Sequence, residues 1–102
     1  MVTINIDPEA LQQLDEYDRW WSQNRPSASA QVFDEVLRVM ELLAEQPEIG
    51  TPYTDDGLKH IRSLRLHAMM PYRIYYHYRP GSDVLTIVYV WSKKRKGRPK
   101  IL

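Results

Sequence analysis

The chain has 102 residues, enough for one domain, and its 43% hydrophobic and 26% charged residues are typical of a folded protein rather than a disordered one. It contains no cysteine, which excludes disulfides, thiolate zinc sites, iron–sulfur clusters and a cysteine nucleophile. The 14 lysines and arginines nearly balance the 13 aspartates and glutamates, so the net charge of +1 does not by itself indicate a polyanionic partner.

The small net charge hides a division between the two parts of the chain. Residues 1–57 carry three basic and twelve acidic side chains, a balance of −9, whereas residues 58–102 carry eleven basic side chains and only Asp83, a balance of +10. Such a division favours a basic surface for an anionic partner on an acidic scaffold. Acidic helices that pair with a basic sheet for solubility would give the same numbers.

The first elements are a strand over residues 2–6 and a helix over residues 8–23. Val-Thr-Ile-Asn-Ile alternates apolar and polar side chains, the pattern of a half-buried strand. Asp7 suits the N-cap of the helix, Pro8 its first position, and Glu9 the positive end of its dipole. The apolar face of this helix is predicted to contain Leu11, Leu14, Tyr17 and Trp21.

A second helix is predicted over residues 27–46. Pro26 disfavours helix at Arg25, and Ser27 can cap a new helix, so the short connection predicts an antiparallel helical hairpin. The helix ends at the Gln-Pro-Glu-Ile-Gly of residues 46–50. Its core-facing stripe is predicted to be Phe33, Val36, Leu37, Met40, Leu43 and Ala44.

Three strands are predicted after a loop over residues 51–57. They cover residues 58–67, 72–79 and 84–91, and Arg79-Pro80-Gly81-Ser82 has proline and glycine where a type II turn requires them. The last strand is apolar at both parities, which predicts a central position. The predicted fold class is therefore α+β, with the element order β-α-α-β-β-β. Residues 1–102 form one domain, in which a helical hairpin packs on a small antiparallel sheet over residues 58–92. A basic tail follows over residues 93–102.

The strand of residues 72–79 separates its side chains into two sets. Alternation places Arg73, Tyr75, His77 and Arg79 on one face, and Tyr72, Ile74, Tyr76 and Tyr78 on the other, which is predicted to face the core. Guanidinium groups beside aromatic rings are suited to contacting phosphates and stacking on bases. Tyrosines on neighbouring strands also cover sheets without binding anything, so both interpretations stand.

The remaining polar residues give weaker indications. Strand parity separates Arg62 from Arg65, so the two need not share a site. The three histidines lack a metal-ligand spacing, and we predict neither a metal nor a cofactor. No glycine-rich phosphate loop, Ser-His-Asp order or paired-carboxylate motif occurs.

Six of the eight residues from Lys93 to Lys100 are cations. This segment offers a salt-sensitive clamp for nucleic acid or for an acidic protein groove, or else a solvated terminus. The longest apolar run, residues 84–91, is far shorter than the roughly 20 residues of a membrane helix. A secretory signal would need a basic head and an apolar body where this chain has Asp7 and Glu9. We therefore expect a cytoplasmic protein that does not contact a membrane.

Four segments, taken in order, resemble the RelE/ParE superfamily of bacterial toxins from type II toxin-antitoxin modules, also called plasmid-stabilisation proteins. They are residues 46–50 at the end of the helical hairpin, Ile-Arg-Ser-Leu at 61–64, Pro-Tyr-Arg-Ile-Tyr-Tyr at 71–76, and Ile-Val-Tyr-Val-Trp at 87–91 with basic residues beyond. The resemblance spans nearly the whole chain. It implies a helical hairpin on an antiparallel sheet, and growth arrest unless a cognate antitoxin wraps the toxin.

The resemblance implies two alternative targets. ParE-like members stall DNA gyrase on cleaved DNA without a recognised catalytic site, whereas RelE-like members are endoribonucleases that cut messenger RNA in the ribosome. RelE-like members tend to carry lysines before the sheet and a tyrosine near the C-terminal end. Here Lys59 is the only lysine before residue 93, and no tyrosine follows Tyr89. We therefore expect a gyrase inhibitor, which need not be an enzyme, with a ribosome-dependent ribonuclease or an inactive interaction module as alternatives.

Each alternative implies a set of residues. The surface that binds the target or the antitoxin is predicted to contain Arg73, Tyr75, His77, Arg79, Trp91, Lys93, Lys94 and Arg95. A ribonuclease would draw its catalytic groups from Arg62, Arg65, Arg73, His77, Tyr89 and Arg95, because RNA cleavage requires proton transfer and phosphate neutralisation. Without antitoxin, apolar surface that it normally covers favours a homodimer.

Overall fold

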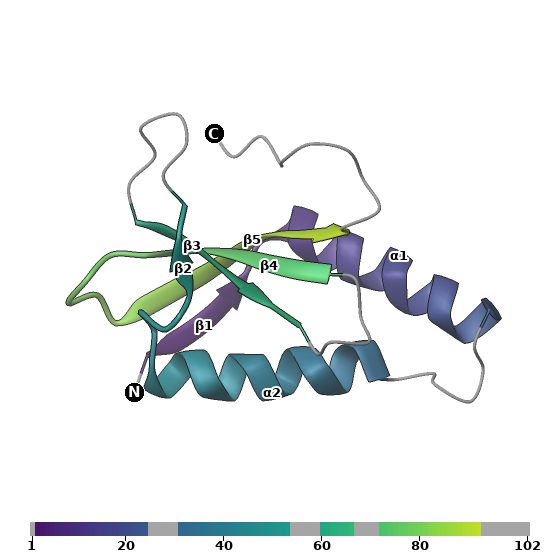
Figure 1. Ribbon diagram of the computed structural model, residues 1–102, viewed down its shortest axis with the longest axis horizontal. Helices are drawn as coiled ribbons and strands as arrows, with labels where there is room; N and C mark the ends of the chain where they lie inside the picture. The colour runs from purple at the N-terminus through teal and green to yellow at the C-terminus, as the bar shows by residue number, and fades with distance from the viewer. Residues whose placement is uncertain (1, 25–30, 54–59, 67–71, 93–102) are drawn as a thin grey trace.

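The computed structural model describes residues 2–24, 31–53, 60–66 and 72–92. Its elements, in chain order, are β1 (Thr3–Ile6), α1 (Pro8–Asn24), α2 (Gln31–Glu45), β2 (Thr51–Pro52), β3 (Ile61–Arg65), β4 (Tyr72–Tyr78) and β5 (Val84–Ser92). Figure 1 shows α1 and α2 running in opposite directions, as the predicted hairpin requires. The α+β class is confirmed. The predicted helix residues 27–30 and the tail 93–102 lie outside the described residues.

The strands form one five-stranded sheet in the order β1-β5-β4-β3-β2. β5 lies between β1 and β4, so its predicted central position is confirmed. The sheet is mixed, because β1 pairs parallel to β5 while the other three pairs are antiparallel. The prediction of a loop throughout residues 51–57 is wrong at its start, where Thr51 and Pro52 pair with Ser63 and Arg62. Two residues that include a proline are too short a pattern to indicate a strand.

Both helices pack on one face of the sheet and enclose the main core. β4 contributes Tyr72, Ile74, Tyr76 and Tyr78 to this core, as the alternation predicts. The remaining fully buried side chains come from both helices, from Leu66 just after β3, and from β5, and they include Ala10, Leu14, Val39, Leu43, Leu85, Ile87 and Val90.

The predicted inward faces of the helices are partly wrong. Leu11 is 50% exposed and Leu37 is 56% exposed, whereas Ala10 on α1 and Val32, Val36, Val39 and Leu43 on α2 are buried. α2 carries two adjacent apolar stripes, one through the valines and Leu43 and the other through Phe33 and Leu37. Periodicity alone does not decide which stripe faces the sheet. The tertiary packing of α2 against β1 and the central strands selects the valine stripe.

Two local features link the elements. Gly81 has a φ of 88° and Ser82 donates its backbone N–H to the Arg79 carbonyl at 2.9 Å, which confirms the predicted turn. α1 covers the edge of β5 beyond the end of β1: Val90 donates its N–H to Gln13 Oε1 at 2.7 Å, and the Tyr17 hydroxyl donates to the Val90 carbonyl at 3.2 Å. Within the described residues, neither helix is long and apolar enough to span a membrane.

Candidate functional site

The sheet face opposite the helices, here called the open face, holds most of the predicted site residues. Strand register places Ser63 beside Tyr75, Arg65 beside Arg73, and Trp91 on the other side of Arg73. β4 thus presents Arg73, Tyr75 and His77 on this face, as alternation predicts. Tyr89 faces Tyr75 from β5 because a bulge between Tyr75 and Tyr76 shifts the register.

Arg65 and Arg73 are directly opposite each other on neighbouring strands. Like charges at such positions repel, because opposed Cβ atoms are only about 4.5–5.5 Å apart. Arg73 Nη1 donates to Ser63 Oγ at 3.0 Å, which fixes this guanidinium against the sheet. Among the described residues, no carboxylate lies within 4.0 Å of either guanidinium. A phosphate bound between the two arginines would relieve the repulsion and match their donor geometry.

The aromatic residues of the open face form a second, smaller hydrophobic cluster. Its buried members are Ile61 and Tyr75, and the partly buried Tyr53, Val88, Tyr89 and Trp91 pack against them. The rings of Tyr53 and Tyr75 meet edge to face with centroids 5.6 Å apart. Tyr75 is only 7% exposed, so its ring packs within the cluster instead of offering a surface for a base. Tyr89 and Trp91 keep partly accessible rings.

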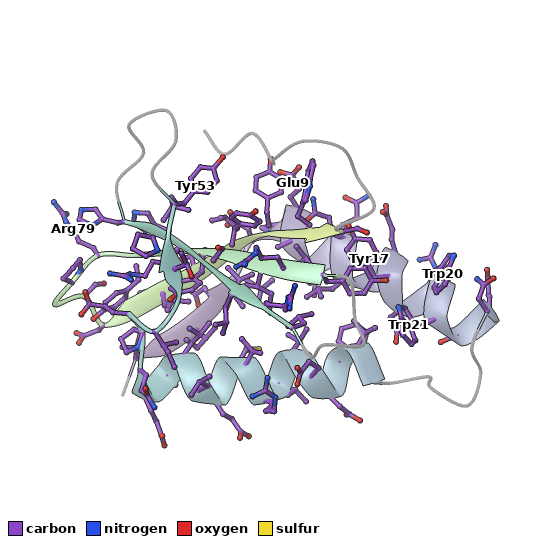
Figure 2. The ribbon with its side chains drawn as sticks, viewed as in Figure 1. Glu9, Tyr17, Trp20, Trp21, Tyr53 and Arg79 are labelled. Carbon is purple, nitrogen blue, oxygen red and sulfur yellow. The ribbon has the colours of Figure 1, made fainter. Side chains whose placement is uncertain are left out.

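Glu9 in the first turn of α1 influences the Tyr89 hydroxyl. Burial raises the pKa of Tyr89, and the Glu9 carboxylate raises it further through its charge and a hydrogen bond to the phenol. Glu9 and Tyr53 both project away from α2 in Figure 2. The Tyr89 hydroxyl is therefore protonated at neutral pH and engaged by an acidic side chain, an arrangement that makes it a poor base.

Arg62 lies on the helix side of the sheet, away from the open face. Its Nη1 donates to the Gly50 carbonyl at 2.8 Å, and its Nη2 lies 3.8 Å from Glu48. Gly50 in turn donates its N–H to the hydroxyl of the fully buried Tyr76 at 2.9 Å. Burial raises the pKa of Tyr76, whereas the hydrogen bond from Gly50 and the charge of Arg62 oppose that rise. The predicted separation of Arg62 from Arg65 is confirmed, and Arg62 holds the end of the helical hairpin to the sheet.

The open face gathers some of the predicted residues and not others. It brings together Arg65, Arg73, Tyr75, His77, Tyr89 and Trp91. Arg79 follows β4 at one end of the sheet, where its side chain is exposed (Figure 2). Lys93, Lys94 and Arg95 lie outside the described residues, so the predicted roles of the tail stay predictions.

Sequence reasoning missed His60. This residue has a φ of 65°, in the left-handed region that costs a non-glycine residue about 1–2 kcal/mol. Its ring lies close to that of His77, with centroids 6.1 Å apart and planes 87° from parallel. Seventeen positions separate the two histidines in the chain, and no local pattern signals the left-handed backbone that brings them together.

A second surface lies between the two helices. A hollow of about 480 Å³ is lined by Pro8, Leu11, Gln12, Asp15 and Phe33, and we call it the helix groove. Leu37 lies one helical turn beyond Phe33 and is more than half exposed. The two helices carry eight acidic and two basic side chains, so the groove is apolar in a negatively charged surround.

Comparisons with known proteins place this geometry among toxins. Residues 4–97 match a family model described as the ParE toxin of the type II toxin-antitoxin system parDE. No curated protein matches the chain in sequence.

Three solved structures share the fold. The chromosomal ParDE toxin-antitoxin system from P. aeruginosa has a chain with a TM-score of 0.71 and 14% identity, covering 90% of this chain and 96% of that one. The isolated E. coli RelE toxin has a TM-score of 0.67 and 14% identity, covering 94% of this chain and 88% of that one. The E. coli RelBE toxin-antitoxin complex has a chain with a TM-score of 0.66 and 15% identity, covering 93% of this chain and 100% of that one. At these identities the structures establish the fold alone.

Proposed function

This chain belongs to the ParE toxin family of type II toxin-antitoxin systems, and on that premise we propose that it inhibits DNA gyrase in the cytoplasm. The open face would engage the gyrase–DNA complex and stall it on cleaved DNA. A cognate antitoxin would neutralise the toxin by covering apolar surface on the helices. The observation that carries the proposal is the Arg65–Arg73 pair, two like charges held side by side with no carboxylate near them among the described residues.

The alternative function is RNA cleavage in the ribosome. The arginine pair and the exposed His77 favour it, since they combine phosphate binding with an imidazole, the side chain most often used for proton transfer in catalysis. Against it, Arg62 lies on the other side of the sheet, and Glu9 engages the Tyr89 hydroxyl. Arg62 is therefore separated from the members of the predicted ribonuclease set that share the open face, and Tyr89 is a poor base, which supports the gyrase proposal.

The open face can be tested with the double variant Arg65→Gln, Arg73→Gln in a gyrase supercoiling assay. We expect inhibition to need about a hundredfold more protein, because two charge-assisted contacts of about 1.5 kcal/mol each are lost. The matched control is Arg19→Gln, which removes an exposed arginine paired with Asp15 on α1. A double variant as potent as the wild type, or a control as weak as the double variant, would contradict the role of the open face.

The antitoxin is proposed to bind in the helix groove. The exposed apolar side chains there suit apolar residues of a partner, and the acidic helices suit lysines and arginines beside them. We expect a double variant, Leu11→Ser with Leu37→Ser, to bind the antitoxin encoded by the neighbouring gene at least about a hundredfold more weakly, because it loses roughly 1.5–3 kcal/mol of apolar contact per side chain.

Calorimetric titration of the antitoxin measures this effect, and gyrase inhibition by the free variant should stay unchanged. Val84→Ser is the control, since Val84 is equally apolar and 42% exposed but lies on β5 and not in the groove. If the groove variant binds as tightly as the control, the antitoxin docks elsewhere.

A further inference from the structure

The left-handed backbone at His60 sets up an unusual juxtaposition. In a regular strand His60 would share the helix side of the sheet with Arg62 and Leu64, because side chains alternate. The φ of 65° breaks that alternation, and the His60 ring instead lies 6.1 Å, centroid to centroid, from the ring of His77 on the open face. Glycine is the residue that adopts this conformation without cost, yet the chain has an imidazole here.

The backbones of both histidines take part in the pairing between strands. His77 pairs with Ile61 on β3 and with Thr86 on β5, so its backbone has neighbours on both sides. Tyr78 donates its N–H to the His60 carbonyl at 2.9 Å, which continues the ladder one residue beyond β3. The backbones that carry the two exposed imidazoles are therefore fixed relative to each other, a degree of preorganisation that histidines on irregular loops lack.

We propose that His60 and His77 together bind a divalent transition metal ion, with Zn²⁺ as the reference ion. Zinc–nitrogen distances of about 2.0–2.1 Å put the metal about 3 Å from each ring centroid, so two rings that bind zinc at a tetrahedral angle have centroids about 5 Å apart. The observed separation is 6.1 Å, and rotation of the two exposed side chains would bring the rings to the binding distance.

The chemistry of the site limits which ion it takes. Imidazole nitrogens suit zinc, copper and nickel, whereas magnesium and calcium prefer oxygen ligands. Among the described residues no third histidine or carboxylate joins the pair, so water or an anion would complete the coordination shell. Arg79, exposed two residues beyond His77, is the nearest cation along the strand and lowers the affinity. The site is independent of the proposed gyrase target, since it needs only the folded chain.

The test is zinc binding to the full chain without an affinity tag, followed by isothermal titration and by thermal unfolding with excess ZnCl₂. We expect ZnCl₂ to raise the unfolding temperature of the wild type and MgCl₂ at the same ionic strength to leave it unchanged. His60→Gly and His77→Gln should each weaken zinc binding by about tenfold or more.

His60→Gly distinguishes loss of a ligand from loss of the fold. Glycine accepts the left-handed backbone, so this variant should unfold at or above the wild-type temperature without metal while losing the response to zinc. His67→Gln removes the third histidine of the chain and should keep the full response. A wild type that responds no more to zinc than to magnesium, or a His60→Gly variant that still responds, would overturn the proposal.

Discussion

Replacing Gly50 by alanine is expected to destabilise the protein by about 3 kcal/mol, because the added methyl group meets packed atoms and strains a buried hydrogen bond. A Cβ at this position would lie 2.6 Å from the Tyr76 hydroxyl and 2.8 Å from the Ser63 carbonyl oxygen. Neither atom can withdraw easily, since Tyr76 is fully buried and Ser63 belongs to β3. Urea unfolding followed by circular dichroism measures the loss.

Gly81→Ala is the matched control for this experiment. Position 81 also favours glycine, because its φ is 88°. Space is not the reason, since no atom lies within 4 Å of a Cβ built there. Alanine at that position should cost only about 1–2 kcal/mol through backbone strain. Equal losses at the two glycines would mean that the close approach of residue 50 to the sheet is not a tightly packed contact.

The second large effect is expected at Leu43, where alanine should cost about 2–5 kcal/mol by leaving a cavity in the core. Leu43 is fully buried, whereas Leu37 on the same helix is 56% exposed. Leu37→Ala should therefore change stability by less than about 0.5 kcal/mol. The same urea unfolding experiment compares the two variants. A loss at Leu37 as large as that at Leu43 would show that α2 is rotated relative to the orientation described above.

The pair of leucines also shows where sequence reasoning succeeds and where it stops. The existence of α2 and its approximate ends follow from periodicity, proline and glycine, which act locally. The choice between its two apolar stripes does not, because it depends on how α2 packs against β1 and the central strands. Leu37 is apolar without being a core residue, and its place one turn beyond Phe33, which lines the helix groove and packs against the core, provides a reason for its character.

The strands show the same limit of prediction from local sequence patterns. Alternation along β4 places every side chain on the correct face, since the period of a strand is fixed by its geometry. Alternation cannot show that Tyr75 is buried on the open face, because that burial comes from Tyr53, just after β2, and from Tyr89 on β5. It also fails at His60, where one left-handed residue reverses the direction of a side chain. The candidate site was thus predictable at Arg73, His77 and Arg65 and not at the residues that depend on long-range packing.

The division of charge along the chain has a spatial counterpart in the described residues. The acidic side chains lie mainly on α1 and α2, and Arg65, Arg73 and His77 lie on the open face. Arg62 is the exception, because it reaches across to Gly50 and Glu48 at the end of the hairpin. The antitoxin and the gyrase–DNA complex, as proposed above, would therefore meet surfaces of opposite charge.

The proposed function is tested most directly by treating gyrase and supercoiled plasmid with the purified protein, then adding detergent and measuring the linear DNA that is released. The proposal predicts that linear DNA accumulates with increasing toxin and that the Arg65→Gln, Arg73→Gln variant releases much less. Undisturbed gyrase together with cut messenger RNA in a ribosome translation reaction containing the same protein would contradict it.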